Sequence, residues 1–394
     1  MKYINDVDIT DKTVFIRCDF NVPMDDNSNI TDDNRIKQAL YTIKYAIDNK
    51  AKVVLSSHLG RPKGVRKPEY SLLPVAKRLS TLLDRKVDFV EDCIGDKVKT
   101  KINSMQPGDV LLLENLRFYE GEEKNSEDFA EKLLQLFDVY VNNAFGVCHR
   151  KHASVYALPK IAKTAVGGFL LKKEIEYFNK ILNAKDRPFV AIVGGAKVSG
   201  KLECLKNLIN KADKIIIGGA QAFTFLKAVG YEVGQSLVED ELIPAASEIL
   251  KTAKDKNVKF YLPVDFVCSK DIKDTLNYIT VGYQEIPKDM MGLDIGEASI
   301  KLFQEVIEDA KVIVWNGPMG VFEVDAFANG TKKIAKIIGE SKALSVVGGG
   351  DTAEAVEIAG ESDNMSYIST GGGASLEILE GKKLPAIEIL EEKA

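Results

Sequence analysis

Residues 189–209 read FVAIVGGAKVSGKLECLKNLI. A short apolar run comes first, a glycine-rich turn follows, and from Leu202 to Ile209 apolar residues return at steps of three and four. The continuous run is typical of a strand buried on both faces, and the later spacing is typical of one face of a helix. The stretch therefore predicts a strand, a loop and a helix in succession.

The same unit recurs along the chain. Runs rich in Val, Ile and Leu predict strands at 13–17, 52–56, 86–90, 109–113, 138–142, 189–193, 213–217, 258–262, 311–315 and 343–347. Most precede helix-period segments, among them 36–47, 72–83, 129–137, 202–209, 300–307 and 334–338. This alternation predicts an α/β fold of mostly parallel sheets covered by helices.

The length of 394 residues suggests two domains. Residues 168–186 have apolar side chains on one side of an expected helix, which the pair Arg187-Pro188 ends. We expect two Rossmann-like domains, at 1–168 and 188–380, joined across a central cleft by a hinge helix and linker at 169–187.

Composition narrows the classes of function. The net charge of −5 gives no basic field, so we expect no nucleic-acid or membrane partner. No stretch approaches the roughly 18 apolar residues of a membrane span, and we expect a cytoplasmic protein. The five cysteines form no CxxC pair, which favours reduced thiols over disulfides or a zinc site. A dyad of Cys148 and His149 is disfavoured, because adjacent side chains on an extended segment point to opposite faces.

Arginine and glycine divide the chain unequally. All nine arginines lie at or before Arg187, with all three histidines in the same part, whereas 22 of 30 glycines follow Pro188. Guanidinium groups suit carboxylate and phosphate oxygens, and glycine-rich turns at helix starts suit nucleotide phosphates. We expect the first half to bind a small acidic metabolite and the second a nucleotide. The alternative is a lysine-rich chain that merely keeps its few arginines early.

The string GGAKVSGK in the second half resembles a phosphate loop but breaks its pattern. Residues 195–201 fit GxxxxGK, yet Leu202 stands where Ser or Thr would hold magnesium. Asp351, after three glycines, is the candidate metal ligand, although its spacing to Glu354 also fits a helix capping box. Lys197 and Lys201 suit phosphates, with plain loop lysines as the alternative.

Eight strings in order along the chain carry a family resemblance. They are CDFNVP at 18–23, SHLGRP at 57–62, ENLRF at 114–118, NNAFGVCHR at 142–150, GGAKVSGK at 194–201, WNGPMGVFE at 315–323, GGGDTA at 348–353 and STGGGASLE at 369–377. Together they resemble phosphoglycerate kinase from about residue 10 to residue 385. That family transfers a phosphoryl group between ATP and the carboxylate of 3-phosphoglycerate, giving ADP and 1,3-bisphosphoglycerate, in glycolysis and gluconeogenesis.

The resemblance implies two sets of site residues. The implied 3-phosphoglycerate site comprises Asp19, Phe20, Asn21, Arg35, His58, Leu59, Gly60, Arg61, Arg117 and Arg150. The implied site for ATP or ADP comprises Lys197, Lys201, Gly292, Leu293, Asn316, Glu323, Gly349, Gly350, Asp351 and Thr352, with Asp351 on Mg²⁺. It also implies that the tail, 381–394, packs back on the first domain. We expect a monomer.

The expected mechanism needs no general base, because a carboxylate acceptor is already ionised at pH 7. We expect Arg35 and Lys197 to meet at the transferring phosphoryl group, with the amides around Gly372 as further donors. Asn143 departs from the family's usual Asp, and we expect this to remove an acceptor behind the arginines; Cys148 replaces a small residue. Another carboxylate kinase and a non-catalytic bilobed binding protein are the alternatives.

Overall fold

The computed structural model describes residues 1–393 and divides into two compact units. The first runs from Met1 to Glu176 and includes the chain from Lys383 onward, and the second runs from Tyr177 to Lys382. The change from one unit to the other falls inside helix α7, Phe169–Leu182. Among the described helices, none combines the length and the apolar composition that crossing a membrane requires.

The first unit is built on a parallel sheet of six strands in the order β3-β4-β2-β1-β5-β6. The strands are β1 Thr13–Cys18, β2 Lys52–Ser56, β3 Val87–Val90, β4 Val110–Leu113, β5 Val139–Asn143 and β6 Ala165–Gly167. The inner strands are buried along nearly their whole length, as their continuous apolar runs predict.

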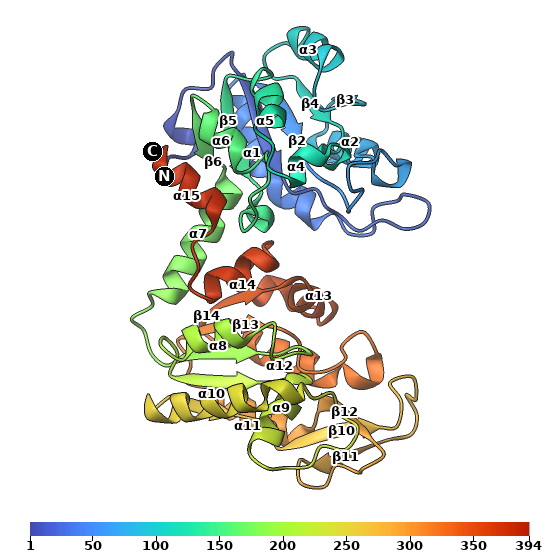
Figure 1. The fold of residues 1–394 in the computed structure, drawn as a ribbon, viewed down its shortest axis with the longest axis vertical. Helices are drawn as coiled ribbons and strands as arrows, with labels where there is room; N and C mark the ends of the chain where they lie inside the picture. Colours follow the sequence, from blue (N-terminus) through green and yellow to red (C-terminus); the bar gives the residue numbers. More distant parts are fainter. Residues whose placement is uncertain (394) are drawn as a thin grey trace. The chain divides into compact units, whose positions relative to one another are not determined.

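Helices cover this sheet (Figure 1). They are α1 Asn34–Asp48, α2 Leu73–Leu83, α3 Asp96–Asn103, α4 Glu120–Glu123, α5 Glu127–Leu134 and α6 Ala157–Ile161. In α1 the buried side chains of Ile36, Ala39 and Ile43 recur at steps of three and four, which fixes the face that packs on the sheet. Helix α15, Pro385–Glu392, lies against α6 and β6.

The second unit contains another parallel sheet of six strands, in the order β15-β14-β13-β7-β8-β9. Its strands are β7 Phe189–Val193, β8 Lys214–Ile217, β9 Lys259–Tyr261, β13 Val312–Asn316, β14 Leu344–Gly348 and β15 Tyr367–Ile368. The prediction of two parallel sheets covered by helices is confirmed.

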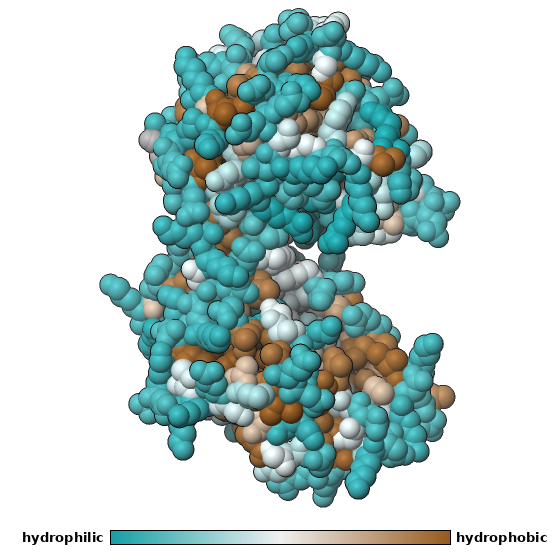
Figure 2. Space-filling model, viewed as in Figure 1, coloured by the Kyte–Doolittle hydropathy of each residue, from teal (hydrophilic) through white to brown (hydrophobic). Residues whose placement is uncertain are grey.

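The covering helices of this unit are α8 Leu202–Leu208, α9 Gln221–Ala228, α10 Ile243–Asp255, α11 Glu297–Ile307, α12 Asn329–Glu340, α13 Gly350–Ile358 and α14 Gly373–Leu379. The visible surface is mostly hydrophilic, with exposed hydrophobic residues gathered mainly on this second unit (Figure 2).

A small antiparallel sheet in the second unit was not predicted. Its strands, in the order β11-β10-β12, are β10 Asp265–Ser269, β11 Tyr278–Gly282 and β12 Met291–Ile295. Strand β11 is largely exposed and β12 contains a glycine and an aspartate, so neither produces a continuous apolar run. Neither strand therefore has the sequence pattern of a strand buried on both faces, which is the pattern that predicted the strands of the parallel sheets.

Candidate active site

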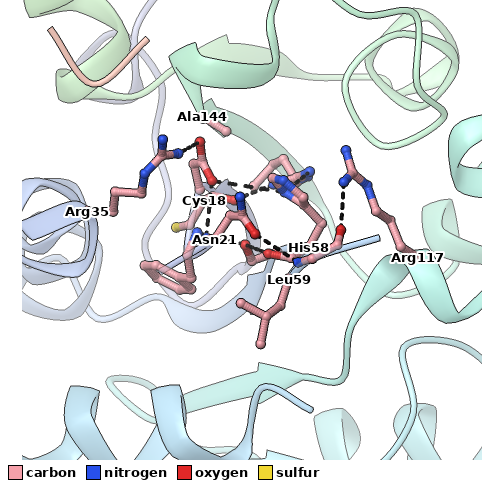
Figure 3. Close-up of polar contacts among 12 residues, drawn as sticks. Cys18, Asn21, Arg35, His58, Leu59, Arg117 and Ala144 are labelled. Atoms are coloured by element: carbon pink, nitrogen blue, oxygen red, sulfur yellow. Dashed lines mark hydrogen bonds and ion pairs between the residues drawn. The ribbon is translucent and has the colours of Figure 1, made fainter. Parts of the chain in front are cut away.

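Three neighbouring strands of the first sheet deliver the predicted acceptor-site residues. Asp19 follows β1, His58 follows β2, and Arg117 follows β4 in a short 3-10 turn. Strands β1 and β2 are paired, as are β2 and β4, so their carboxyl ends lie at one edge of the sheet. The loops that follow these strands therefore lie side by side, and Figure 3 shows His58 between Arg35 and Arg117.

Hydrogen bonds tie the loops to one another. The Gly60 amide donates to Asn21 Oδ1 at 2.8 Å, and the Phe20 amide donates to Ser57 Oγ at 2.8 Å. Asn115 Nδ2 donates to the Leu59 carbonyl at 2.7 Å. Phe20 and Leu59 have buried side chains, and their backbone groups link the loops through these hydrogen bonds. Asn21 likewise uses its side-chain oxygen within the protein (Figure 3).

Asp19 and Arg35 form an ion pair that joins the end of β1 to helix α1. Burial alone would raise the pKa of the Asp19 carboxyl, but the guanidinium groups nearby, Arg35 above all, outweigh it and lower that pKa to about 2. Asp19 is therefore ionised at neutral pH. The Arg35 side chain remains one-third exposed, which leaves part of its fork of donors open to an anion.

Arg117 is held from two sides. Its Nη1 donates to the Gly60 carbonyl at 2.8 Å, and its Nε lies 3.6 Å from a carboxylate oxygen of Glu123. Burial, with Arg17 and Arg150 as positive neighbours, lowers the pKa of Arg117 to about 10, so it is still charged at pH 7. Arg150 is half-buried, and its Nε lies 3.2 Å from His149 Nε2.

Arg61 differs from the other predicted arginines. Its side chain is exposed. The structure thus brings Arg35, Arg117 and Arg150 to the neighbourhood of His58 and His152, and leaves Arg61 at the surface of the loop after β2.

Sequence reasoning missed Arg17, Glu122 and His152. Arg17 and Glu122 are fully buried, and His152 is nearly so. Burial, together with Arg117, Arg17 and Arg150, lowers the pKa of His152 to about 3. One signal was available in the sequence, because Arg17 interrupts the apolar strand TVFIRC with a charge that must find buried partners.

The glycines of the second unit have two distinct uses. A Cβ on Gly194 would lie 2.2 Å from the Pro318 carbonyl oxygen, and one on Gly219 would lie 2.4 Å from that of Gly195. These two allow the loops after β7, β8 and β13 to pack backbone against backbone. Gly350 and Gly372, in contrast, have open space where a side chain would stand, so no close contact of the backbone requires glycine at these two positions.

Lys201 and Asn316 connect the loop after β7 to the end of β13 through a hydrogen bond from Nζ to the side-chain oxygen. Thr352 Oγ1 accepts from the Gly317 amide at 2.7 Å, which adds the loop after β14. Burial lowers the pKa of Lys201, while Asp351 is among the groups that oppose this shift. The structure therefore brings Lys201, Asn316, Asp351 and Thr352 together, with Gly349 as the cap of α13.

The remaining predicted nucleotide residues are distributed around this group. The Gly292 amide donates to Ser236 Oγ at 2.9 Å, and the Leu293 carbonyl accepts from the Val321 amide at 2.8 Å, so β12 adjoins the loop after β13. Lys197 is exposed, and its charge contributes to lowering the pKa of Glu239. Glu323 is exposed as well.

Two expectations from the sequence need correction. One concerns the start of α13, and the other concerns Asn143, which stands where the family usually has Asp. Asp351 does not form a capping box with Glu354, because α13 begins at Gly350 and its cap residue is Gly349, which has no side chain. The hydrogen bonds of the Asn143 side-chain oxygen come from groups other than the arginines. Its Oδ1 accepts from Thr42 Oγ1 at 2.9 Å and from the Leu170 amide at 3.1 Å, which places it at the start of α7.

Cys148 is a buried thiol whose pKa burial raises to about 12, which argues against a nucleophilic dyad with His149. Within residues 1–393 no cluster of three or more His, Cys, Asp or Glu side chains could hold a metal by itself. Asp351 is an exposed carboxylate at a helix N-terminus beside Lys201. Such a single ligand fits Mg²⁺ only where phosphate oxygens and water complete the coordination.

Comparison with known proteins identifies the family. The family model described as phosphoglycerate kinase matches residues 4–382. The phosphoglycerate kinase of Geobacter sp. strain M21 is 56% identical over 394 residues, covering 100% of this chain and 99% of its own length. That of Aquifex aeolicus is 54% identical over 392 residues, with 100% and 98% covered.

Solved structures agree with this result. The phosphoglycerate kinase of Coxiella burnetii superposes with a TM-score of 0.89 at 41% identity, covering 100% of this chain and 99% of that one. The enzyme of Pyrococcus horikoshii superposes with a TM-score of 0.89 at 34% identity and the same coverage. On these matches, which span nearly the whole of each chain, the protein belongs to the phosphoglycerate kinase family.

Proposed function

We propose that this chain catalyses the reversible transfer of a phosphoryl group between ATP and the carboxylate of 3-phosphoglycerate, giving ADP and 1,3-bisphosphoglycerate. As a member of its family it is a kinase with a carboxyl group as acceptor. The observation that carries the proposal is the grouping of Arg35, His58 and Arg117 at one sheet edge of the first unit.

The acceptor is a small molecule with a carboxylate and a phosphate, and guanidinium forks match both groups. Arg35 and Arg117 each keep donors that the protein does not use, because their ion pairs with Asp19 and Glu123 involve only part of each fork. Asp19 limits the excess positive charge when the site is empty. We propose that Arg61, exposed beside this group, and Arg150 complete the acceptor site.

The second unit supplies the proposed nucleotide site. Backbone amides at Gly350 and Gly372 stand at helix starts, where the partial positive charge favours phosphate. Lys201 lies beside Asn316 and would neutralise phosphate charge, with Lys197 in the adjoining loop. Asp351 would hold Mg²⁺, which supplies neutralisation of the nucleotide phosphates when bound. Gly292, Leu293 and Glu323 would contact the nucleoside.

The proposed reaction is a displacement at phosphorus. An oxygen of the ionised carboxylate forms a bond to the γ-phosphorus, and the bond from that phosphorus to the bridging oxygen breaks, with its electron pair leaving on ADP. No proton has to move, so no general base is required. The protein's task is to position two anions and to stabilise the charge on the transferring group. We assign this task to Arg35, Lys197 and the Gly372 amide.

An acyl phosphate is readily hydrolysed, so water must be excluded during transfer and the product released afterwards. We propose that α7, which belongs partly to each unit, is the hinge for this motion. We also propose that the working form is a monomer in the cytoplasm. The five cysteines, all buried free thiols, suit a reducing compartment.

The test is an assay in which 3-phosphoglycerate, Mg²⁺ and ATP yield ADP and 1,3-bisphosphoglycerate. Arg35→Ala should lower kcat by about 100-fold or more, because it removes a cation that acts on the transferring group. Near wild-type turnover of this variant at saturating substrate would refute the role of Arg35. Turnover with acetate or aspartate, and none with 3-phosphoglycerate, would refute the proposed acceptor.

A further inference from the structure

Arg17 is a fully buried cation at the carboxyl end of β1. Its Nε donates to Ser154 Oγ at 2.7 Å, its Nη1 donates to the Cys18 carbonyl, and its Nη2 lies 3.3 Å from His58 Nδ1. Because no part of it reaches the surface, Arg17 does not itself meet a substrate. Its contact with His58 is its link to the acceptor site.

A buried guanidinium is stable only with nearby negative charge and satisfied hydrogen bonds. Glu122, also fully buried, provides the charge, with a carboxylate oxygen 3.8 Å from Arg17 Nη2. Glu122 in turn accepts from the Ser154 hydroxyl at 2.6 Å and from the Ser154 amide at 2.9 Å. The Ser154 hydroxyl thus accepts from Arg17 and donates to Glu122, and joins the two.

This arrangement decides which nitrogen of His58 carries a proton. A guanidinium group has five donors and no acceptor, so a hydrogen bond between Arg17 and His58 Nδ1 requires Nδ1 to be the acceptor. The proton of the neutral ring then lies on Nε2. The nearest carboxylate, Asp19, is 4.0 Å from Nδ1, beyond the reach of a hydrogen bond.

The charged groups that face His58 also keep the ring neutral. Burial lowers the pKa of His58 well below its ordinary value. Asp19 acts in the opposite direction, but Arg17, Arg117 and Arg35 act together with burial. A neutral ring that carries its proton on Nε2 is a hydrogen-bond donor at that atom, and a donor suits an anionic acceptor substrate.

We propose that Glu122 and Ser154 are positioning residues that hold Arg17 against His58 Nδ1, and so present His58 Nε2–H as a donor to the acceptor substrate. The identity of that substrate rests on the proposed function. The tautomer of His58 does not, because the contacts that set it are all within the protein.

The experiment compares Ser154→Ala with a matched control, Ser299→Ala. Ser299 is equally buried, and its hydroxyl and amide donate to the Asp265 carboxylate at 2.6 and 2.7 Å, which reproduces the Ser154–Glu122 contact far from the acceptor residues in the chain. Nitrogen-15 NMR of labelled histidine reports the tautomer directly. With three histidines in the chain, a His58→Gln variant assigns the signal.

The wild-type protein should show His58 with protonated Nε2 and unprotonated Nδ1 at pH 7. In Ser154→Ala, His58 should no longer be a single tautomer. KM for 3-phosphoglycerate should rise by about 5-fold or more, which is the effect of one hydrogen bond. KM for ATP should be nearly unchanged. Ser299→Ala should change neither reading. If Ser154→Ala does not fold, Glu122→Gln of similar size should give the same two changes.

A proton on Nδ1 of His58 in the wild-type protein would overturn the proposal, whether or not any variant folds. So would a Ser154→Ala protein with an unchanged His58 spectrum. If the expected tautomer is found but the protein does not phosphorylate 3-phosphoglycerate, the proposed function fails and the positioning of His58 stands.

Discussion

The side-chain amide of Asn143 uses only part of its hydrogen-bonding capacity. Its oxygen accepts two hydrogen bonds, from Thr42 and from the Leu170 amide at the start of α7, but its Nδ2 is buried without a partner. Turning the amide over would aim Nδ2 at these donors, so the orphan donor is a property of asparagine at this position. An unsatisfied buried donor costs about 1–3 kcal/mol.

Asn143→Asp should therefore stabilise the first unit. A carboxylate accepts the same two hydrogen bonds, has no orphan donor, and places negative charge at a helix N-terminus, which together outweigh its desolvation. We expect the free energy of unfolding at pH 7 to rise by about 1 kcal/mol, measured by urea denaturation. Asn183→Asp, exposed just past the end of α7, should give no gain. A destabilised Asn143→Asp protein would mean that charge burial dominates.

Gly194 and Gly200 provide a second residue-scale test, because they share one loop and differ in surroundings. A Cβ on Gly194 would collide with the Pro318 carbonyl oxygen, whereas the nearest atom to a Cβ on Gly200 is 4.0 Å away. Gly194→Ala should destabilise the protein by about 2 kcal/mol and raise KM for ATP, because the loops after β7 and β13 must separate. Gly200→Ala should keep wild-type stability. Equal effects in thermal denaturation would contradict this account.

The site residues that the sequence predicted best are those whose type and position along the chain both match the family. His58, Arg35 and Arg117 were predicted by resemblance, and the structure places them together. Arg17, Glu122 and Ser154 were missed, because their roles depend on contacts between β1, α4 and the segment after β5, which are far apart in the chain. A charged residue within an apolar strand indicates that it has buried partners, but it does not indicate which residues these are.

At the scale of elements, strand β12 and helix α12 are joined by one carboxylate. Asp294, buried in β12, accepts from the Gly330 amide at 2.7 Å in the first turn of α12. Burial raises the pKa of Asp294 to about 7, although the backbone amides of Gly330 and Ile295 act against this shift. The ordinary pKa of an aspartate is about 3.9, so the folded protein holds this proton more tightly than the unfolded chain does.

This difference gives stability a pH dependence of definite sign. A raised folded-state pKa favours folding below the unfolded pKa, and the advantage is lost as the pH rises towards about 7. Between pH 5.5 and pH 8 the Asp294 contribution should fall by roughly 2 kcal/mol. Asp294→Asn, which keeps an oxygen acceptor for Gly330, should remove that part of the slope. Parallel stability curves for the two proteins in urea would disprove the assignment.

Strands were predicted well where both of their faces are buried. The inner strands of both parallel sheets have apolar residues on both faces, so their apolar runs gave their positions to within a residue or two. Strand β11 is exposed at three of its five residues and pairs with β10, a partner that no local sequence pattern indicates. The antiparallel sheet was missed for that reason.

At the scale of the molecule, the chain builds two units, each with its own parallel sheet and its own proposed substrate site. The chain passes from one unit to the other within helix α7, at Tyr177, and returns at Lys383. Our proposal is that a bend in α7 moves one unit against the other without breaking either sheet. Because the reaction joins two anions away from water, we expect the two sites to approach one another only when both ligands are bound.

Small-angle scattering measures this motion directly. With 3-phosphoglycerate and Mg-ADP both present, the radius of gyration should decrease relative to the free protein, and either ligand alone should produce a smaller change or none. Arg35→Ala is the control, because weakened attraction for the acceptor should reduce the compaction at the same ligand concentrations. The two ligands must bind the compact state more tightly than the open one, so each should also lower the other's Kd. An unchanged radius at saturating concentrations of both would rule out closure about α7.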